Sequence, residues 1–249
     1  VARRDLWPQV EPLLSRVERP ARYLNHEWGC AAPVAEGDFA FCMIYPDTYE
    51  LGQANQAVRI LVNAVNAMGG MGAERAFLPA VDMADLMREE GVPLFSLESC
   101  RPVADFDVVG ITLPHELAAT NVLETLDLAG IPLRAADRAE GDPIVLAGGP
   151  CAYNPEPYAP FFDVILVGEG EEQLPEVLAL IRELRVGPLL RSCALSAIPE
   201  DVDLLVNNPQ IAVTSAGERV LELDFSGALR DYLTFVGLDE WELAGSLTL

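Results

Sequence analysis

Three glycine-containing loops hold the side chains best placed for chemistry. They run from Asp47 to Gly52, from Gly148 to Pro150, and from Gly168 through Glu169 to Gly170, and each follows a short apolar segment. Glycine allows close approach of the backbone to a ligand, or a positive φ. If the apolar segments are parallel strands, the loops share one sheet edge, where a long ligand could lie. Tight turns between strands and helices would need the same glycines, so both interpretations stay open.

Two further groups of polar residues belong to the same expected edge. His115 follows Pro114 at the end of the apolar segment 107–113, and its imidazole could contact a ligand or cap the following helix. The carboxylates near 169–172 could suggest a metal site. We favour the simpler explanation that a helix N-terminus attracts acidic side chains without an ion, and we expect no metal.

Several common sites are excluded by motif. The chain has no GxGxxG after its first strand, no GxxxxGK[ST] and no arrangement typical of a serine hydrolase. Its five cysteines are scattered, with no two within four residues of each other, which excludes CxxC and the CxxxCxxC of an iron–sulfur cluster. An odd, scattered set of thiols is typical of a reducing cytoplasm, so we expect a cytoplasmic protein.

The elements that must position these loops alternate along the chain. Continuous apolar runs predict strands, and a 3.6-residue apolar period predicts helices. The predicted strands are 39–45, 73–78, 107–113, 143–147 and 163–167. The predicted helices are 51–68, 82–90 with Asp82 as its cap, 116–129 and 171–184, and we expect Gly91 and Gly130 to end the second and the third. This order predicts an α/β fold: a doubly wound, mainly parallel five-stranded sheet of Rossmann-like or flavodoxin-like type.

Outside residues 38–185 the alternation of predicted strands and helices becomes weaker. We expect an N-terminal lead-in over 1–37 with a short helix interrupted at Pro20, the α/β domain over 38–185, and an irregular small α+β segment over 186–249. In that last segment, 211–214 and 219–223 could pair as a hairpin, and 226–235 could form a helix.

Composition limits the partners. The 249 residues include 39 acidic and 16 basic side chains, a net charge of −23, so a nucleic-acid partner is not expected. No apolar run approaches the about 20 residues that span a bilayer, and no signal core is present, so no membrane partner is expected either. The chain begins with valine, which indicates a fragment or an alternative start codon.

The loops resemble the cobalamin-binding domain of B12-dependent enzymes, whose first loop reads D-x-H-x-x-G. Here Asp47 and Gly52 match and Tyr49 stands at the histidine position. The family's S-x-L falls on 112–114, beginning at Thr112, which is a poor match, and its later G-G falls on Gly148 and Gly149.

More specifically, RVERPARYL, YPDTYELG, LFSLES, LDLAGIPL, AGGPCAYNPEP and VGEGEE look like the N-terminal region of B12-binding-domain radical SAM proteins, over residues 16–184. The resemblance implies a cobalamin held without a protein histidine on cobalt. The corrin would lie near Tyr49 and Thr112, and the nucleotide tail would run toward Gly148 and Gly149.

The chain departs from that family in having no CxxxCxxC. We therefore expect a corrinoid-binding module that is not catalytic alone and that works with a radical SAM domain or partner chain. The alternative is a structural or interaction domain that kept the fold and lost the corrinoid. An independent enzyme ranks last, because no acid–base pair or nucleophile stands out.

Overall fold

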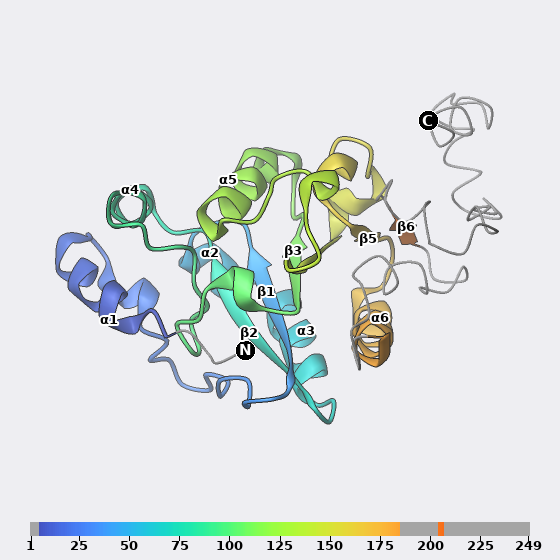
Figure 1. The fold of residues 1–249 in the computed structure, drawn as a ribbon, viewed down its shortest axis with the longest axis horizontal. Coiled ribbons are helices and arrows are strands. Elements are labelled where there is room, and N and C mark those ends of the chain that lie inside the picture. The colour runs from blue at the N-terminus through green and yellow to red at the C-terminus, as the bar shows by residue number, and fades with distance from the viewer. Residues whose placement is uncertain (1–4, 185–203, 207–249) are drawn as a thin grey trace.

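A six-stranded sheet forms the centre of the molecule, in a computed structural model that describes residues 5–184 and 204–206 (Figure 1). The strands are β1 (Phe39–Tyr45), β2 (Met71–Phe77), β3 (Val108–Thr112), β4 (Ile144–Gly148), β5 (Val164–Leu166) and β6 (Leu204–Val206). Their order is β2-β1-β3-β4-β5-β6. The first five are parallel and β6 pairs antiparallel with β5.

Helices cover both faces of the sheet. They are α1 (Trp7–Val10), α2 (Tyr49–Ala54), α3 (Gln56–Asn66), α4 (Val81–Glu90), α5 (Ala119–Ala129) and α6 (Gly170–Leu184). Short 3-10 turns lie at Glu11–Arg16, Pro20–Tyr23, Val103–Asp105, Glu116–Ala118, Ala135–Asp137, Pro150–Tyr153 and Ala159–Phe161. The doubly wound α/β fold expected from the sequence is confirmed for the five parallel strands, and the sheet gains one unpredicted strand, β6, from the segment expected to be irregular. No helix among the described residues has the length and apolar character needed to cross a bilayer.

The alternation of side chains along β1 divides the core in two. Phe39, Phe41, Met43 and Tyr45 join the apolar cluster that also holds the buried faces of α3 and α6. The intervening Ala40, Cys42 and Ile44 join the cluster with α4, α5 and the lead-in. Because side chains alternate across a strand, one fully apolar run supplies both layers, as the continuous pattern of parallel strands predicts.

Two of the predicted helices are wrong in detail. The helix expected over 51–68 is two helices, because Asn55 is extended (ψ 119°) and its side chain accepts hydrogen bonds from the amides of Ala57 and Val58. The apolar period alone does not reveal this internal N-cap. Helix α4 begins at Val81 after the N-cap Ala80, so Asp82 lies in the first turn and is not the cap. The stops at Gly91 and Gly130 are confirmed as left-handed C-caps.

The lead-in is packed into the domain core. Leu6, Val10 and Leu13 are buried in the same cluster as α4 and α5. The amide of Val34 donates to the buried carboxylate of Glu74 in β2 at 2.9 Å. The expected break of a helix at Pro20 takes the form of a new 3-10 turn that begins there. The hairpin expected at 211–214 and 219–223 and the helix at 226–235 lie outside the described residues.

Candidate functional site at the carboxyl edge of the sheet

The parallel sheet brings the predicted loops together. In the order β2-β1-β3-β4-β5 the direction of winding reverses between β1 and β3, and ligands in such sheets bind at that point. We call the carboxyl ends of β1 to β5, with the loops that follow them, the carboxyl edge. All ten predicted residues lie there: Asp47, Tyr49, Gly52, Thr112, His115, Gly148, Gly149, Gly168, Glu169 and Gly170.

Asp47 joins the ends of β1 and β2. Its amide donates to the carbonyl of Tyr45 at 2.8 Å, and its carbonyl accepts from the amide of Leu78 at 3.1 Å. Its carboxylate accepts from the amide of Thr48 at 2.7 Å. Aspartate is common in turns because its side chain accepts bonds from nearby amides. These contacts account for Asp47 as a turn residue, and they leave its role toward a ligand a prediction.

Tyr49 is held at the start of α2. Its ring meets the ring of Phe77 edge-on, with centroids 5.3 Å apart. Burial and a hydrogen bond to Glu27 raise the pKa of the Tyr49 phenol above its ordinary value. The phenol therefore stays protonated at neutral pH, and a protonated phenol is a poor metal ligand.

Gly52 is a contact point between α2 and the sheet. A Cβ at this position would lie 2.3 Å from the ring of Phe77 and 2.9 Å from the Cβ of Tyr45. The absence of a side chain thus lets α2 pack directly on the ends of β1 and β2. The Asp–Gly spacing of this loop has a structural explanation that is independent of any ligand.

Thr112, Gly148 and Gly149 lie together where β3 and β4 end. Thr112 and Gly148 are register partners, and the amide of Leu113 donates to the carbonyl of Gly148 at 2.7 Å. Gly149 has a φ of +108°, and a Cβ there would lie 3.0 Å from the hydroxyl of Thr112 and 3.2 Å from the backbone of Leu113. At Gly148 the nearest atom to a Cβ would be 3.8 Å away.

The remaining predicted residues lie in the turns after β3 and β5. His115 is exposed at the N-cap position of the turn Glu116–Ala118, where its carbonyl accepts from the amide of Ala118 at 3.1 Å and its imidazole makes no capping bond. Its contact with a ligand stays a prediction. Gly168 has a φ of +123°. The carbonyl of Glu169 accepts from the amides of Glu172 and Gln173 at 3.2 Å, which starts α6. Among the described residues no group of acidic, histidine or cysteine side chains is placed to hold a metal ion.

Exposed apolar side chains at this edge were missed from the sequence. Large hydrophobic residues with high exposure follow four consecutive strands: Leu51 (56%), Val81 (77%), Leu117 (86%) and Tyr153 (63%). Leu51, Leu117 and Tyr153 each stand after a polar or glycine-containing loop at a strand end, and that recurrence was the available signal, whereas Val81 follows the apolar residues 78–80. These four side chains share the carboxyl edge and offer apolar contacts to a ligand or a partner there.

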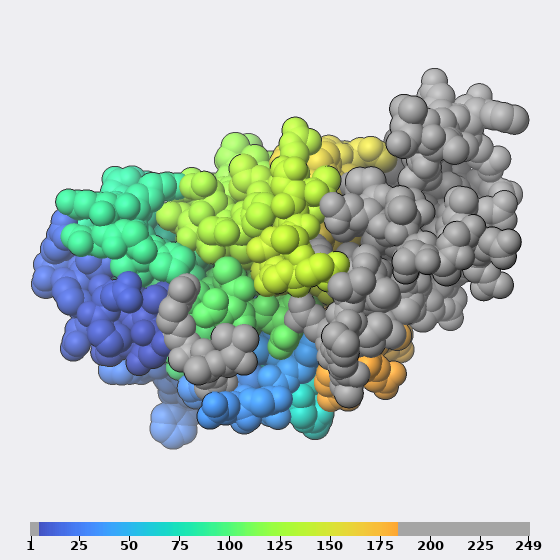
Figure 2. Space-filling model, in the orientation of Figure 1, coloured from blue at the N-terminus to red at the C-terminus, as the bar shows by residue number. Residues whose placement is uncertain are grey.

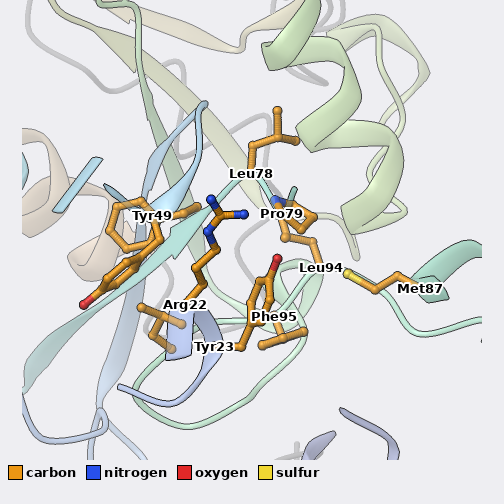
Figure 3. A pocket seen from close by; sticks show the side chains of 10 residues that line it. Arg22, Tyr23, Tyr49, Leu78, Pro79, Met87, Leu94 and Phe95 are labelled. Carbon is orange, nitrogen blue, oxygen red and sulfur yellow. The ribbon is translucent and has the colours of Figure 1, made fainter. Parts of the chain in front are cut away.

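A small cavity lies beside Tyr49 and is bordered on one side by the lead-in (Figure 3). Its volume is about 20 Å³, enough for a water molecule, and Arg22, Tyr23, Leu78, Pro79 and Phe95 are among its lining residues. The guanidinium of Arg22 pairs with Glu50 of α2 at 2.9 Å. The lead-in thus borders the carboxyl edge, a placement that the sequence pattern did not predict.

A model of a known protein family matches this chain. A family model described as radical SAM proteins, N-terminal, matches residues 57–201, which is more than half of the chain. No curated protein and no solved structure matches the chain. The match spans α3 to α6, and so includes the loops after β2, β3, β4 and β5. The chain therefore belongs to the radical SAM protein N-terminal family.

Proposed function

We propose that this chain is a corrinoid-binding module of a radical SAM protein. The observation that carries the proposal is the gathering of all ten predicted residues at one carboxyl edge, around the point where the strand order reverses. The ligand would lie across the ends of β1 and β3, near Tyr49 and Thr112. Its nucleotide tail would run toward Gly148 and Gly149.

The residues at the edge fit a broad, partly apolar macrocycle. Leu51, Leu117 and Tyr153 offer exposed apolar contacts around the ends of β1, β3 and β4. At Gly148, where a Cβ would meet nothing closer than 3.8 Å, the missing side chain permits close approach of a ligand to the backbone. When bound, a corrinoid supplies radical or group-transfer chemistry at its cobalt–carbon bond.

Tyr49 takes the place of a histidine ligand, and its chemistry supports a corrinoid with no protein group on cobalt. Its phenol is protonated, hydrogen-bonded to Glu27 and packed against Phe77. The role left to this residue is to shape the surface under the macrocycle. Because the 249 residues contain no CxxxCxxC, the iron–sulfur cluster of a radical SAM system would come from another domain or chain.

The exposed apolar side chains also favour a second candidate. Leu51, Val81, Leu117 and Tyr153 would equally suit contact with another protein surface, as expected for an interaction domain without a corrinoid. In that case the glycines would be turn residues alone. The two candidates differ in whether a coloured cofactor is retained.

Titration with hydroxocobalamin, followed by desalting and a visible spectrum, tests the proposal. We expect corrinoid to be retained at close to one per chain. Changing Tyr49 to phenylalanine should leave the bound spectrum nearly unchanged, because the phenol does not touch cobalt in this proposal. A folded but colourless protein after desalting would overturn it and favour the interaction domain.

A further inference from the structure

A second, larger cavity lies away from the glycine loops, between the lead-in and the turn that follows α4. It is an open groove of about 330 Å³, lined by Asp5, Trp7, Tyr23, Leu24, Asn25, His26, Phe95, Ser96, Leu97, Glu98, Ser99 and Cys100. We call it the lead-in groove. Figures 1 and 2 show the lead-in beside α4 at one end of the molecule. The volume is at the lower end of the about 300–1,000 Å³ typical of small-molecule sites.

One wall of the groove is a short hairpin that hydrogen bonds hold against the sheet. Phe95 and Pro102 form an antiparallel bridge, and the amide of Ser96 donates to the carbonyl of Arg101 at 2.9 Å. The hydroxyls of Ser96 and Ser99 both donate to the buried carboxylate of Glu74, at 2.6 and 2.5 Å. These bonds fix the wall to β2, so the groove is formed without a ligand.

Glu98, which lines the groove, forms a buried ion pair with Arg75 of β2. The side chain of Glu98, which is fully buried, accepts from the guanidinium of Arg75 at 2.6 Å and from its amide at 2.7 Å. Asn25, in the lead-in, accepts from the same guanidinium at 2.8 Å. Arg75 is therefore engaged by its neighbours, and the groove does not offer its positive charge to an anion.

Backbone strain is concentrated at this groove. Asn25 (φ 50°) and Cys100 (φ 52°) are the two non-glycine residues with positive φ in the described part of the chain, and both line it. The left-handed region costs L-residues free energy, and such residues cluster at ligand-binding sites. Asn25 uses this conformation to reach Arg75, and the carbonyl of Cys100 accepts from the amide of Leu6 at 2.9 Å.

We propose that the lead-in groove binds a small organic cation with an apolar body. The aromatic side chains of Trp7, Tyr23 and Phe95 line it, and aromatic faces attract ammonium groups. Asp5 supplies an exposed carboxylate, held in place by the amide of Trp7 at 2.8 Å. With Arg75 paired, the remaining acidic group favours a cation over an anion.

The proposal is independent of corrinoid binding. The groove shares Tyr23, Phe95 and Leu97 with the small cavity beside Tyr49, so the two cavities are neighbours. Asp5 itself lines only the groove. A change at Asp5 should therefore leave the hydroxocobalamin titration as it is, and either proposal can fail while the other stands.

Three probes of matched size test the charge preference: benzylamine, benzyl alcohol and benzoate, titrated calorimetrically into the full chain. We expect saturable binding of benzylamine at one per chain, at least about tenfold tighter than benzoate, with benzyl alcohol between them. Equal affinities for the three probes, or no saturable binding of benzylamine, would overturn the proposal.

Paired variants locate the site. Asp5→Asn keeps an oxygen for the amide of Trp7 but removes the charge, so benzylamine affinity should fall about three- to tenfold while benzyl alcohol affinity stays unchanged. Asp85→Asn, on the exposed side of α4, makes the same change of net charge outside the groove and should alter neither. Equal effects of the two variants would show a general charge effect and overturn the assignment.

Discussion

The ring of Phe77, at the end of β2, occupies the space that a side chain at Gly52 would need. A Cβ on Gly52 would lie 2.3 Å from two atoms of that ring. Tyr49, one turn earlier in α2, packs edge-on against the same ring. One aromatic side chain thus sets how closely α2 approaches the sheet, and it ties together two residues that the cobalamin-like loop pattern had singled out.

Replacing Gly52 with alanine should destabilise the fold. The added methyl group must displace the Phe77 ring or lift α2, which costs about 1–3 kcal/mol in a well-packed core. Urea denaturation followed by circular dichroism measures the free energy of unfolding. Gly69→Ala is the matched control, because a Cβ there meets nothing within 4 Å. Equal stability of the two variants would mean that Gly52 is not a packing residue.

Replacing Gly148 with phenylalanine should abolish corrinoid retention and leave the fold intact. A side chain at Gly148 has ordinary contacts, the nearest at 3.8 Å, and would project where the ligand is proposed to lie. Gly149 is unsuitable for this test, because its φ of +108° strains any other residue. The measurement is the visible spectrum after desalting, beside a thermal melt.

Gly141→Phe is the control for Gly148, since Gly141 is exposed and has nothing within 4 Å of a Cβ. It should retain corrinoid like the parent chain. Full retention by Gly148→Phe would show that the ligand does not cross the ends of β3 and β4.

Arg138 and Asp163 form a fully buried ion pair between the loop before β4 and the start of β5, with nitrogen and oxygen 2.9 Å apart. The same carboxylate oxygen accepts from the amide of Val145 at 2.8 Å. Arg138→Met removes the cation and keeps much of the volume, so we expect a loss of about 3–5 kcal/mol in the free energy of unfolding.

The exposed pairs of Arg88 with Glu124 and Asp127 provide the comparison for Arg138. Arg88→Met should cost about 0–1 kcal/mol, because solvent screens such pairs. If both variants lost the same stability in urea denaturation, burial of the Arg138 pair would not be the deciding factor.

Burial and the nearby carboxylate of Asp5 raise the pKa of the Cys100 thiol from its ordinary value to about 12. The thiolate is the form that alkylates, so in the native protein at pH 8 Cys100 should react with iodoacetamide at least about 100-fold more slowly than in the denatured chain. Site-resolved mass spectrometry measures both rates. Native labelling as fast as in denaturant would contradict the burial.

The same shift has a consequence for stability at high pH. Because the folded-state pKa of Cys100 lies above its unfolded value of about 9, its contribution is fully present below pH 9 and is lost as the pH rises toward 12. In Cys100→Ala the decline in the free energy of unfolding between these pH values should be shallower. An unchanged slope would argue against the shift.

The sequence alone determined the alternation of elements. Apolar runs such as 39–45 had to be buried on both faces, and helical periods between them required crossovers, so a parallel α/β sheet followed. The sequence also predicted that helices end at Gly91 and Gly130, because left-handed C-caps favour glycine. The loops at strand ends then fell on one edge by topology.

Only the tertiary structure decided what each edge residue contacts. The closeness of Gly52 to Phe77 and of Gly149 to Thr112 depends on strands that are distant in sequence. The lead-in groove depends on residues near 5–26 meeting a hairpin near 95–100 through Glu74, Arg75 and Glu98. Local sequence patterns do not predict these contacts, because they depend on long-range packing. That packing determines which polar groups are buried together and which apolar side chains remain exposed.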